Sequence, residues 1–159
     1  MRQGANTRTI GIGLLLVIAP STAEAKRFAI ACEGITLFRE RNMFGPGHTD
    51  TQPADRIYVI DEDLHRAAQV LTGPPRKLED LCGPDRSPNC SSSFSDVAIY
   101  VGGERLMQKD QLTVGQTFRY DRKANTVESV VKLEWTTGRM ITMTYSMKCV
   151  PTDVPDLPF

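Results

Sequence analysis

Hydrophobic and polar residues alternate along most of the chain, and the alternation is clearest near the C-terminus. Residues 127–135, VESVVKLEW, and residues 141–149, ITMTYSMKC, each place apolar side chains at every second position. Since the side chains of a strand point alternately to opposite faces, this period predicts two strands with one buried and one solvated face. The intervening Thr136-Thr137-Gly138 predicts the turn of an antiparallel hairpin.

Shorter stretches with the same period predict further strands. These stretches are residues 28–33, 56–60, 96–101 and 117–121. A turn is expected at residues 122–125, where Asn125 suits the left-handed backbone conformation. The Gly102-Gly103 pair is typical of a two-residue hairpin turn, which predicts a returning strand at residues 104–108.

The other segments between these strands predict irregular or mixed structure. Residues 42–54 and 72–95 contain several Gly and Pro residues, and we expect them to be long loops. Residues 64–71 fit either a strand or a helical turn, and residues 75–81 fit a helical turn. The Pro-rich tail at residues 151–159 is expected to fray.

Together these elements predict an all-β fold, or a β-rich α+β fold with one or two short helical turns. About seven or eight short antiparallel strands would form a small barrel or half-barrel. Since Cys32 and Cys149 fall on inward positions of the first and last strands, those two strands are expected to lie side by side. Their pairing would close the sheet and remove an exposed edge.

The N-terminus has the features of a secretory signal peptide. Arg2 and Arg8 supply positive charge, residues 10–19 form an apolar run, and Ala23-Glu24-Ala25 places small residues where a signal peptidase cleaves. The apolar run is shorter than the roughly 20 residues that a membrane-spanning helix needs. The segment is therefore interpreted as a signal for export and not as a retained anchor.

Cleavage after Ala25 divides the chain into a signal peptide at residues 1–25, one antiparallel β domain at residues 26–150 and a tail at residues 151–159. We expect the mature protein to be periplasmic or secreted, with no integral membrane segment.

The composition narrows the classes of partner. The chain has 159 residues, with 19 Lys and Arg against 19 Asp and Glu, and 40% of its residues are hydrophobic. That length and apolar content fit one globular domain. A net charge of zero with scattered signs argues against nucleic acid or an anionic membrane surface as the partner. Any partner is expected to bind by shape complementarity and through loops.

Four cysteines, Cys32, Cys82, Cys90 and Cys149, all lie in the mature part. An even number in an exported domain favours structural disulfides, and four cysteines allow three pairings. We favour Cys82–Cys90, which closes a short loop, and Cys32–Cys149, which ties the first strand to the last. Zinc binding is disfavoured because the spacing does not form two short ligand clusters.

Two clusters carry groups capable of chemistry, and neither forms a convincing site. Residues 61–63, Asp-Glu-Asp, with His65 could hold a divalent cation, but they lack the glycine and terminal Glu of a helix-loop-helix calcium site. Residues 91–93, three serines, with His65 could suggest a hydrolase triad, but no Gly-x-Ser-x-Gly elbow is present. We therefore expect no catalytic residue, no metal, no cofactor and no enzymatic activity.

Aromatic and methionine side chains offer a possible binding surface. Trp135, Tyr145, Tyr100 and Met143 would line a ligand cavity if the barrel were hollow, and would be core if it were filled. Phe44, in a Gly- and Pro-containing segment, is the candidate for an exposed contact.

The order of these segments resembles small exported β-sheet proteins of Gram-negative bacteria whose activity is not established. The resemblance rests on FAIAC at residues 28–32, RIYVID at 56–61, the mid-chain Cys pair, FRYDRKAN at 118–125 and MTYSMKC at 143–149. Ala124-Asn125 stands where such proteins usually have a turn glycine. The resemblance implies a location and a fold type and nothing catalytic.

A looser similarity is to periplasmic inhibitors of lysozyme, which are small β-barrels with a disulfide near the chain ends. Their Ser-Gly-x-x-Tyr loop has no clear match, because residues 95–100 lack the glycine, so no inhibitory residue is carried over. From the sequence we expect a binding or structural module of the cell envelope. The alternatives are a lysozyme-inhibitor-like protein and a lipocalin-like small-ligand carrier. An envelope protein partner would be met through residues 42–54 or 72–95.

Overall fold

The computed structural model describes residues 26–43, 45–83, 89–107 and 111–159. The expected signal peptide and Phe44 lie outside these residues. The described residues form nine strands and no helix: β1 (Arg27–Asn42), β2 (Gly45–Asp61), β3 (Arg66–Leu71), β4 (Lys77–Asp80), β5 (Ser91–Phe94), β6 (Ala98–Met107), β7 (Leu112–Asp121), β8 (Thr126–Trp135) and β9 (Met140–Thr152). The all-β class is confirmed.

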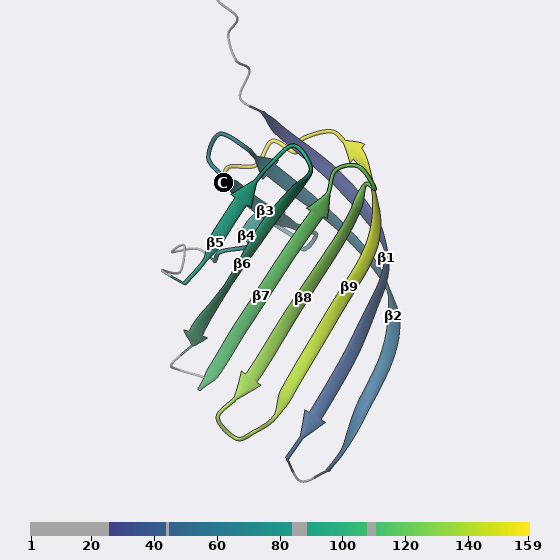
Figure 1. Cartoon of the computed structure of the whole chain (residues 1–159), viewed down its shortest axis with the longest axis vertical. Helices are drawn as coiled ribbons and strands as arrows, with labels where there is room; N and C mark the ends of the chain where they lie inside the picture. Colours follow the sequence, from purple (N-terminus) through teal and green to yellow (C-terminus); the bar gives the residue numbers. More distant parts are fainter. Residues whose placement is uncertain (1–25, 44, 84–88, 108–110) are drawn as a thin grey trace, which may run out of the picture.

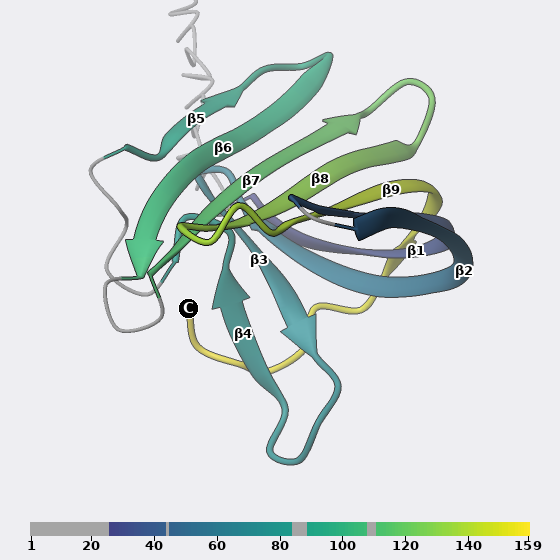
Figure 2. The same ribbon diagram turned by 90° about the horizontal axis from the view of Figure 1, so that it is seen from below.

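All nine strands belong to one antiparallel sheet with the order β4-β3-β2-β1-β9-β8-β7-β6-β5 (Figure 1). The sheet curls into a half-barrel, so that the arm of β5 and β6 and the arm of β3 and β4 lie on opposite sides of the bend (Figure 2). The expected pairing of the first and last strands is confirmed, with Cys32 directly opposite Cys149. That pairing does not remove the sheet edges, because β4 and β5, in the middle of the chain, are left at the two ends.

The C-terminal hairpin is confirmed almost residue by residue. β8 pairs with β9 from Thr126 opposite Lys148 to Glu134 opposite Met140. The turn between β7 and β8 is also as expected, with Asn125 at a φ of 51°. These strands were predictable because each has one buried face, which makes the alternation strong.

The loop expected at residues 42–54 is wrong, because most of that segment is the first part of β2. Pairing with β1 continues down to His48 opposite Glu40, and the turn is near residue 45. β3 pairs with β2 only over residues 58–61, so residues 45–57 lie on a free edge of the sheet. Pro is tolerated on a free edge, where its missing N–H has no partner to lose, which explains why Pro46 and Pro53 did not prevent a strand.

Of the two alternatives for residues 64–71, the strand is confirmed and the helical turn is not, and the helical turn expected at residues 75–81 is wrong. Residues 66–71 form β3 and residues 77–80 form β4, and the described part of the chain contains no helix. Strands this short leave too few residues to separate a period of two from a helical period. The segment 72–95 is therefore not one long loop, since β4 and β5 both lie in it. Residues 84–88, between those strands, are outside the described part.

The hairpin turn expected at Gly102-Gly103 is wrong, because β6 runs straight through both residues. A Cβ built on Gly102 would lie 2.6 Å from the Tyr100 hydroxyl oxygen, and one on Gly103 would lie 2.8 Å from the Cys90 Cα. The Tyr100 ring thus covers Gly102 on one face of the strand, and Cys90 packs against Gly103 on the other. The two glycines mark close approaches within a strand.

The main core lies on the face of the sheet that points into the curl, which we call the inner face. Fully buried side chains on it include Ile30, Ile60, Ile99, Val101, Phe118 and Val127. The Tyr58 ring of β2 and the Phe118 ring of β7 lie 4.9 Å apart between centroids, although three strands separate β2 from β7 in the sheet. Since side chains from the two sides of the curl touch here, this part of the barrel is filled.

A second buried cluster covers the outer face of the same region. Ala29, Val59 and Val70 pack with Leu157 and Phe159 of the tail. The Arg27 guanidinium donates a hydrogen bond to the Leu157 carbonyl at 2.6 Å, and the guanidinium groups of Arg27 and Arg66 lie 5.0 and 4.8 Å from the Phe159 ring centroid. The expectation that the tail frays is therefore wrong. Its last aromatic ring is held between two cations.

The sheet thus has two halves. The closed half holds both buried clusters, with sheet, turns or tail on each side. The open half is a single layer, made of residues 35–42 of β1, 45–53 of β2, 104–107 of β6, 112–116 of β7, 130–135 of β8 and 140–145 of β9. Among the described residues, no helix is long and apolar enough to cross a membrane.

Candidate functional site

Two disulfides hold the closed half together, and they are the pairs that the cysteine spacing favours. Cys32–Cys149 joins β1 to β9 with a Cα–Cα distance of 4.0 Å. Cys82–Cys90 joins the chain just after β4 to the chain just before β5, with a Cα–Cα distance of 5.5 Å. The second bridge therefore links the two edges of the sheet, which share no backbone ladder.

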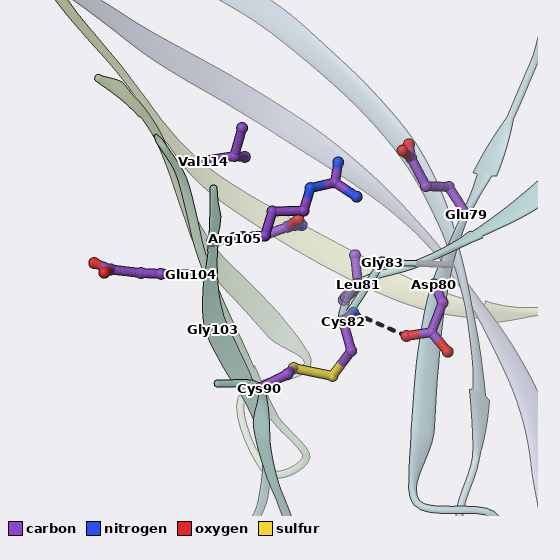
Figure 3. Close-up of a pocket in the computed structure, with 11 residues that line it drawn as sticks. Glu79, Asp80, Leu81, Cys82, Gly83, Cys90, Gly103, Glu104, Arg105 and Val114 are labelled. Carbon is purple, nitrogen blue, oxygen red and sulfur yellow. Dashed lines mark hydrogen bonds between the residues drawn. A yellow bond between two sulfur atoms is a disulfide. The ribbon is translucent and has the colours of Figure 1, made fainter. Parts of the chain in front are cut away.

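A small hollow lies beside this second bridge (Figure 3). It is lined by residues 79–83, Cys90, residues 103–105, Val114 and Gln116, and its volume is about 20 Å³. That is room for a single water molecule and excludes an organic ligand. The Asp80 carboxylate at its wall accepts a hydrogen bond from the Cys82 N–H at 2.8 Å and pairs with Arg66 at 2.7 Å. This arrangement supports the fold.

The acidic turn at residues 61–63 is used in local and turn-to-turn contacts. The Asp61 carboxylate accepts a hydrogen bond from the Leu64 N–H at 2.9 Å. Glu62 pairs with Arg122, whose guanidinium also lies over the Phe28 ring at 5.7 Å. In the part of the chain that the structure describes, no group of three or more His, Cys, Asp or Glu side chains is arranged to hold a metal ion.

The serine run and His65 also make structural contacts. The Ser92 hydroxyl donates to the backbone carbonyl of His65 at 3.3 Å, and the Ser91 hydroxyl donates to the Gly102 carbonyl at 3.4 Å. The His65 ring stacks on Phe94 at 5.3 Å between centroids. The Ser92 and Phe94 contacts connect β5 to the turn before β3 across the gap between the sheet edges, whereas the Ser91 contact lies within the β5–β6 pair. None of them is the serine–imidazole contact that a triad requires.

Three shifted pKa values report burial or turn geometry. Burial raises the pKa of the Tyr58 phenol and that of the Tyr120 phenol. Tyr120 also donates a hydrogen bond to the Asn125 side-chain oxygen at 3.0 Å. Hydrogen bonds from the Ala124 and Lys123 backbone N–H groups lower the pKa of Asp121. All three groups lie in or next to the turns and core of the closed half, where they stabilise the fold.

The inner face of the open half is mostly apolar on β1, β9, β8 and β7, whereas β2 places Gln52, Asp50 and His48 on it. Strand alternation and register place one contiguous row of half-buried side chains there, across β1, β9, β8 and β7: Phe38, Met143, Val131, Ile141, Leu133, Val114, Trp135 and Leu112. We call this set the apolar row. Tyr145 joins the row to the core, since it packs against the main core cluster and its hydroxyl lies 3.7 Å from the Met143 sulfur.

The structure brings together three of the four residues suggested for a ligand surface. Trp135, Tyr145 and Met143 share the inner face, whereas Tyr100 lies on the outer face over Gly102. Sequence analysis missed Arg56 and Arg105, the half-buried arginines on this face. Their signal was present in the strand period, because each falls on an inward position of its strand.

Larger hollows lie on the outer face and are more open. One of about 500 Å³ includes Tyr100, Gly102, Gly115 and Lys132. Another of about 460 Å³ lies over Arg39, Thr49 and Thr142 in the open half. Neither has a buried polar side chain directed into it, so neither has the convergent polar groups of a built ligand site.

Comparisons with protein-family models, with curated proteins and with solved structures found no match for this chain. The resemblance to small exported proteins therefore stays a prediction from the motifs.

Proposed function

We propose that this chain is an exported, disulfide-stabilised β domain of the bacterial cell envelope that works as a binding module through the inner face of its open half. The apolar row is the observation that carries this proposal. A single-layer sheet with one apolar face normally buries that face against a second layer. In the described residues a second layer meets the row only at Val114, which faces residues 79–83 across the small hollow. Large uncovered apolar surfaces usually mark binding sites.

Export is supported by the four cysteines, all paired, and by the signal-like sequence of residues 1–25. Disulfides persist in oxidising compartments and are rare in the cytosol. Binding rather than catalysis is supported by the acidic turn and the serine run, which are engaged in contacts that hold the fold.

Export is tested by mass spectrometry of the protein recovered from the periplasm of an expressing Gram-negative host. We expect an N-terminus at Lys26 and no thiol that reacts with an alkylating reagent before reduction. An N-terminus at Met1, or free thiols, would overturn the export part of the proposal.

The binding face is tested with the neutral dye Nile red, whose emission rises on apolar surfaces. Val131 and Val130 are adjacent on β8 and point to the inner and outer faces, respectively, so they make a matched pair. We expect the wild type and Val130→Glu to enhance the emission and Val131→Glu to lose most of the enhancement. Equal enhancement by the two variants would contradict the assignment of the face.

A second candidate is an envelope protein partner, such as a lysozyme, bound at the free edge of β2. Among the described residues, only β1 pairs with residues 45–57 of that strand, so another chain could add a strand there. A lysozyme turnover assay with equimolar protein distinguishes the two candidates. Inhibition by the wild type that persists in Val131→Glu would favour the edge over the inner face.

A further inference from the structure

Residues 79–83, the end of β4 and the turn after it, form the second layer that meets the apolar row, and we call this segment the cover. It faces Val114 of β7 across the small hollow beside the Cys82–Cys90 bridge (Figure 3). Leu81 of the cover is buried and packs in the main core. The position of the cover therefore sets how much of the inner face is open to a ligand, and this step rests on the proposed binding role of that face.

The cover belongs to the arm of β3 and β4. The Leu81 N–H donates a hydrogen bond to the Ala67 carbonyl of β3 at 2.9 Å, and the Gly83 N–H donates to the Asp80 carbonyl at 2.8 Å. The Asp80 carboxylate pairs with Arg66 of β3 at 2.7 Å. Backbone and charge thus hold the cover to its own arm.

The cover is joined to the opposite arm, made of β5 and β6, in a different way. β4 and β5 are the two ends of the sheet, so no backbone ladder connects them. The Cys82–Cys90 disulfide links the cover to the start of β5. Beside it the Arg105 guanidinium packs against Gly83, since a Cβ built on Gly83 would lie 2.8 Å from an Arg105 nitrogen. Without the disulfide, side-chain packing is what remains to hold the cover against β5 and β6.

The two disulfides differ in their access to solvent. Cys32 and Cys149 are 0% and 6% exposed, and their bridge lies between β1 and β9 in the middle of the sheet. Cys82 is also buried, but Cys90 is half-buried and follows the exposed Asn89 at the sheet edge. Thiol–disulfide exchange requires a thiolate to reach one of the two sulfurs. The edge bridge is therefore the one that a reductant reaches first.

We propose that Cys82–Cys90 is a reducible latch that controls how far the cover closes over the apolar row. A dithiol reductant supplies a thiolate that attacks the Cys90 sulfur, and the Cys82 sulfur leaves as a thiolate. The second thiolate of the reductant then attacks the reductant's own sulfur in the mixed disulfide, which releases Cys90. The reductant ends as a disulfide, and Cys82 and Cys90 end as thiols with the two electrons and two protons that it has lost.

Opening the latch leaves the two arms connected through the centre of the sheet, where Cys32–Cys149 stays closed. The cover can then move away from β6 with its own arm, and the Val114 end of the apolar row becomes accessible from inside the curl. Reduction thus enlarges the binding face, and reoxidation restores the cover.

The selectivity of the latch is tested by titrating the folded wild type with dithiothreitol, trapping free thiols with iodoacetamide and locating them by mass spectrometry. We expect Cys82 and Cys90 to be alkylated at a dithiothreitol concentration about tenfold or more below that needed for Cys32 and Cys149. The far-ultraviolet circular dichroism should be unchanged at that point. Reduction of both bridges together, or of Cys32–Cys149 first, would overturn the latch.

The effect on the binding face is tested with Nile red on two open forms: the wild type alkylated only at Cys82 and Cys90, and the variant Cys82→Ser/Cys90→Ser. We expect both to enhance the emission more than the oxidised wild type does. Adding Val131→Glu to the variant should abolish the gain, whereas adding Val130→Glu, on the outer face, should keep it. General unfolding would respond equally to the two valine changes, so an equal response, or no gain in either open form, would overturn the proposal.

Failure of the latch can be distinguished from failure of the proposed function. If Val131→Glu and Val130→Glu differ in the oxidised protein but opening the latch does not raise the emission, the inner face binds apolar ligands and the latch is wrong. If the two valine variants differ in neither the oxidised nor the open protein, both proposals are wrong.

Discussion

The closed and open halves share strands but differ in how many layers cover them. In the closed half, Ile30 and Cys32 of β1 are almost fully buried on one face, and Ala29 is buried on the other. Farther along the same strand, Ile35 is 52% exposed and Phe38 is half-buried. The hydrogen-bond ladder with β9 is continuous through both parts. The difference shows that the ladder alone does not create a core, because a core also needs an opposing layer.

The four predictions below test that comparison. Each change removes a feature that one half has and the other lacks.

The largest effect is expected from the bridge between the first and last strands. The two disulfides close sequence separations of 117 and 8 residues. On the chain-entropy model the longer closure contributes about 5 kcal/mol and the shorter about 2.5 kcal/mol to the free energy of unfolding. Urea unfolding of Cys32→Ala/Cys149→Ala and of Cys82→Ala/Cys90→Ala measures both losses. A larger loss from the second variant would mean that tying the sheet edges matters more than joining β1 to β9.

Aromatic truncations compare the halves directly. Phe118 is fully buried in the closed half, and Phe118→Ala is expected to lower the free energy of unfolding by about 3–5 kcal/mol. Trp135 is half-buried in the open half, and Trp135→Ala is expected to cost less than about 1 kcal/mol. Denaturant midpoints at constant m-value give both numbers. Similar losses would mean that the open half is packed as tightly as the closed half.

The tail tests the outer cover of the closed half. Phe159→Ala removes the ring held between Arg27 and Arg66 and is expected to cost about 1–2 kcal/mol. Hydrogen exchange should accelerate at β3, which lies beneath the tail, and stay unchanged in the open half. Val154→Ala, at a position that is 41% exposed, is the control and should have little effect. Uniform acceleration over all strands would contradict a local role for the tail.

The smallest effect is expected at alkaline pH. Because burial raises the pKa of Tyr58, the folded state keeps the phenolic proton where the unfolded state loses it. Stability is therefore fully present below about pH 10 and falls as the pH rises above it, by at most about 1.4 kcal/mol per pH unit for one group. Urea midpoints at several alkaline pH values measure this slope. Tyr58→Phe should reduce this slope and leave the part contributed by Tyr120, whereas Tyr100→Phe, at an exposed position, should retain it.

The strands with one buried face could be predicted from the sequence, whereas the exposed first part of β2 in the open half could not. The β8–β9 hairpin and the turn at Asn125 were predictable because one face of each strand is buried and the other is wet. The first part of β2 was missed because its residues are mostly exposed and include two prolines, which weakens the alternation. At the candidate site, Trp135, Tyr145 and Met143 could be named from their period. Arg56 and Arg105 were missed because a charged residue at an inward position looks like an exception until its neighbours are known.

The sequence by itself determined the β class, the period of the C-terminal strands and a short choice of cysteine pairings, because alternation and spacing are properties of neighbouring residues. Only the tertiary structure decided that β4 and β5 are the sheet edges, that Gly102 and Gly103 mark close approaches, and that Phe159 covers the outer face. These outcomes depend on how far the sheet curls and which segments meet across it. The same curl leaves most of the apolar row without a second layer, and strand alternation carries no information about whether a face will be covered.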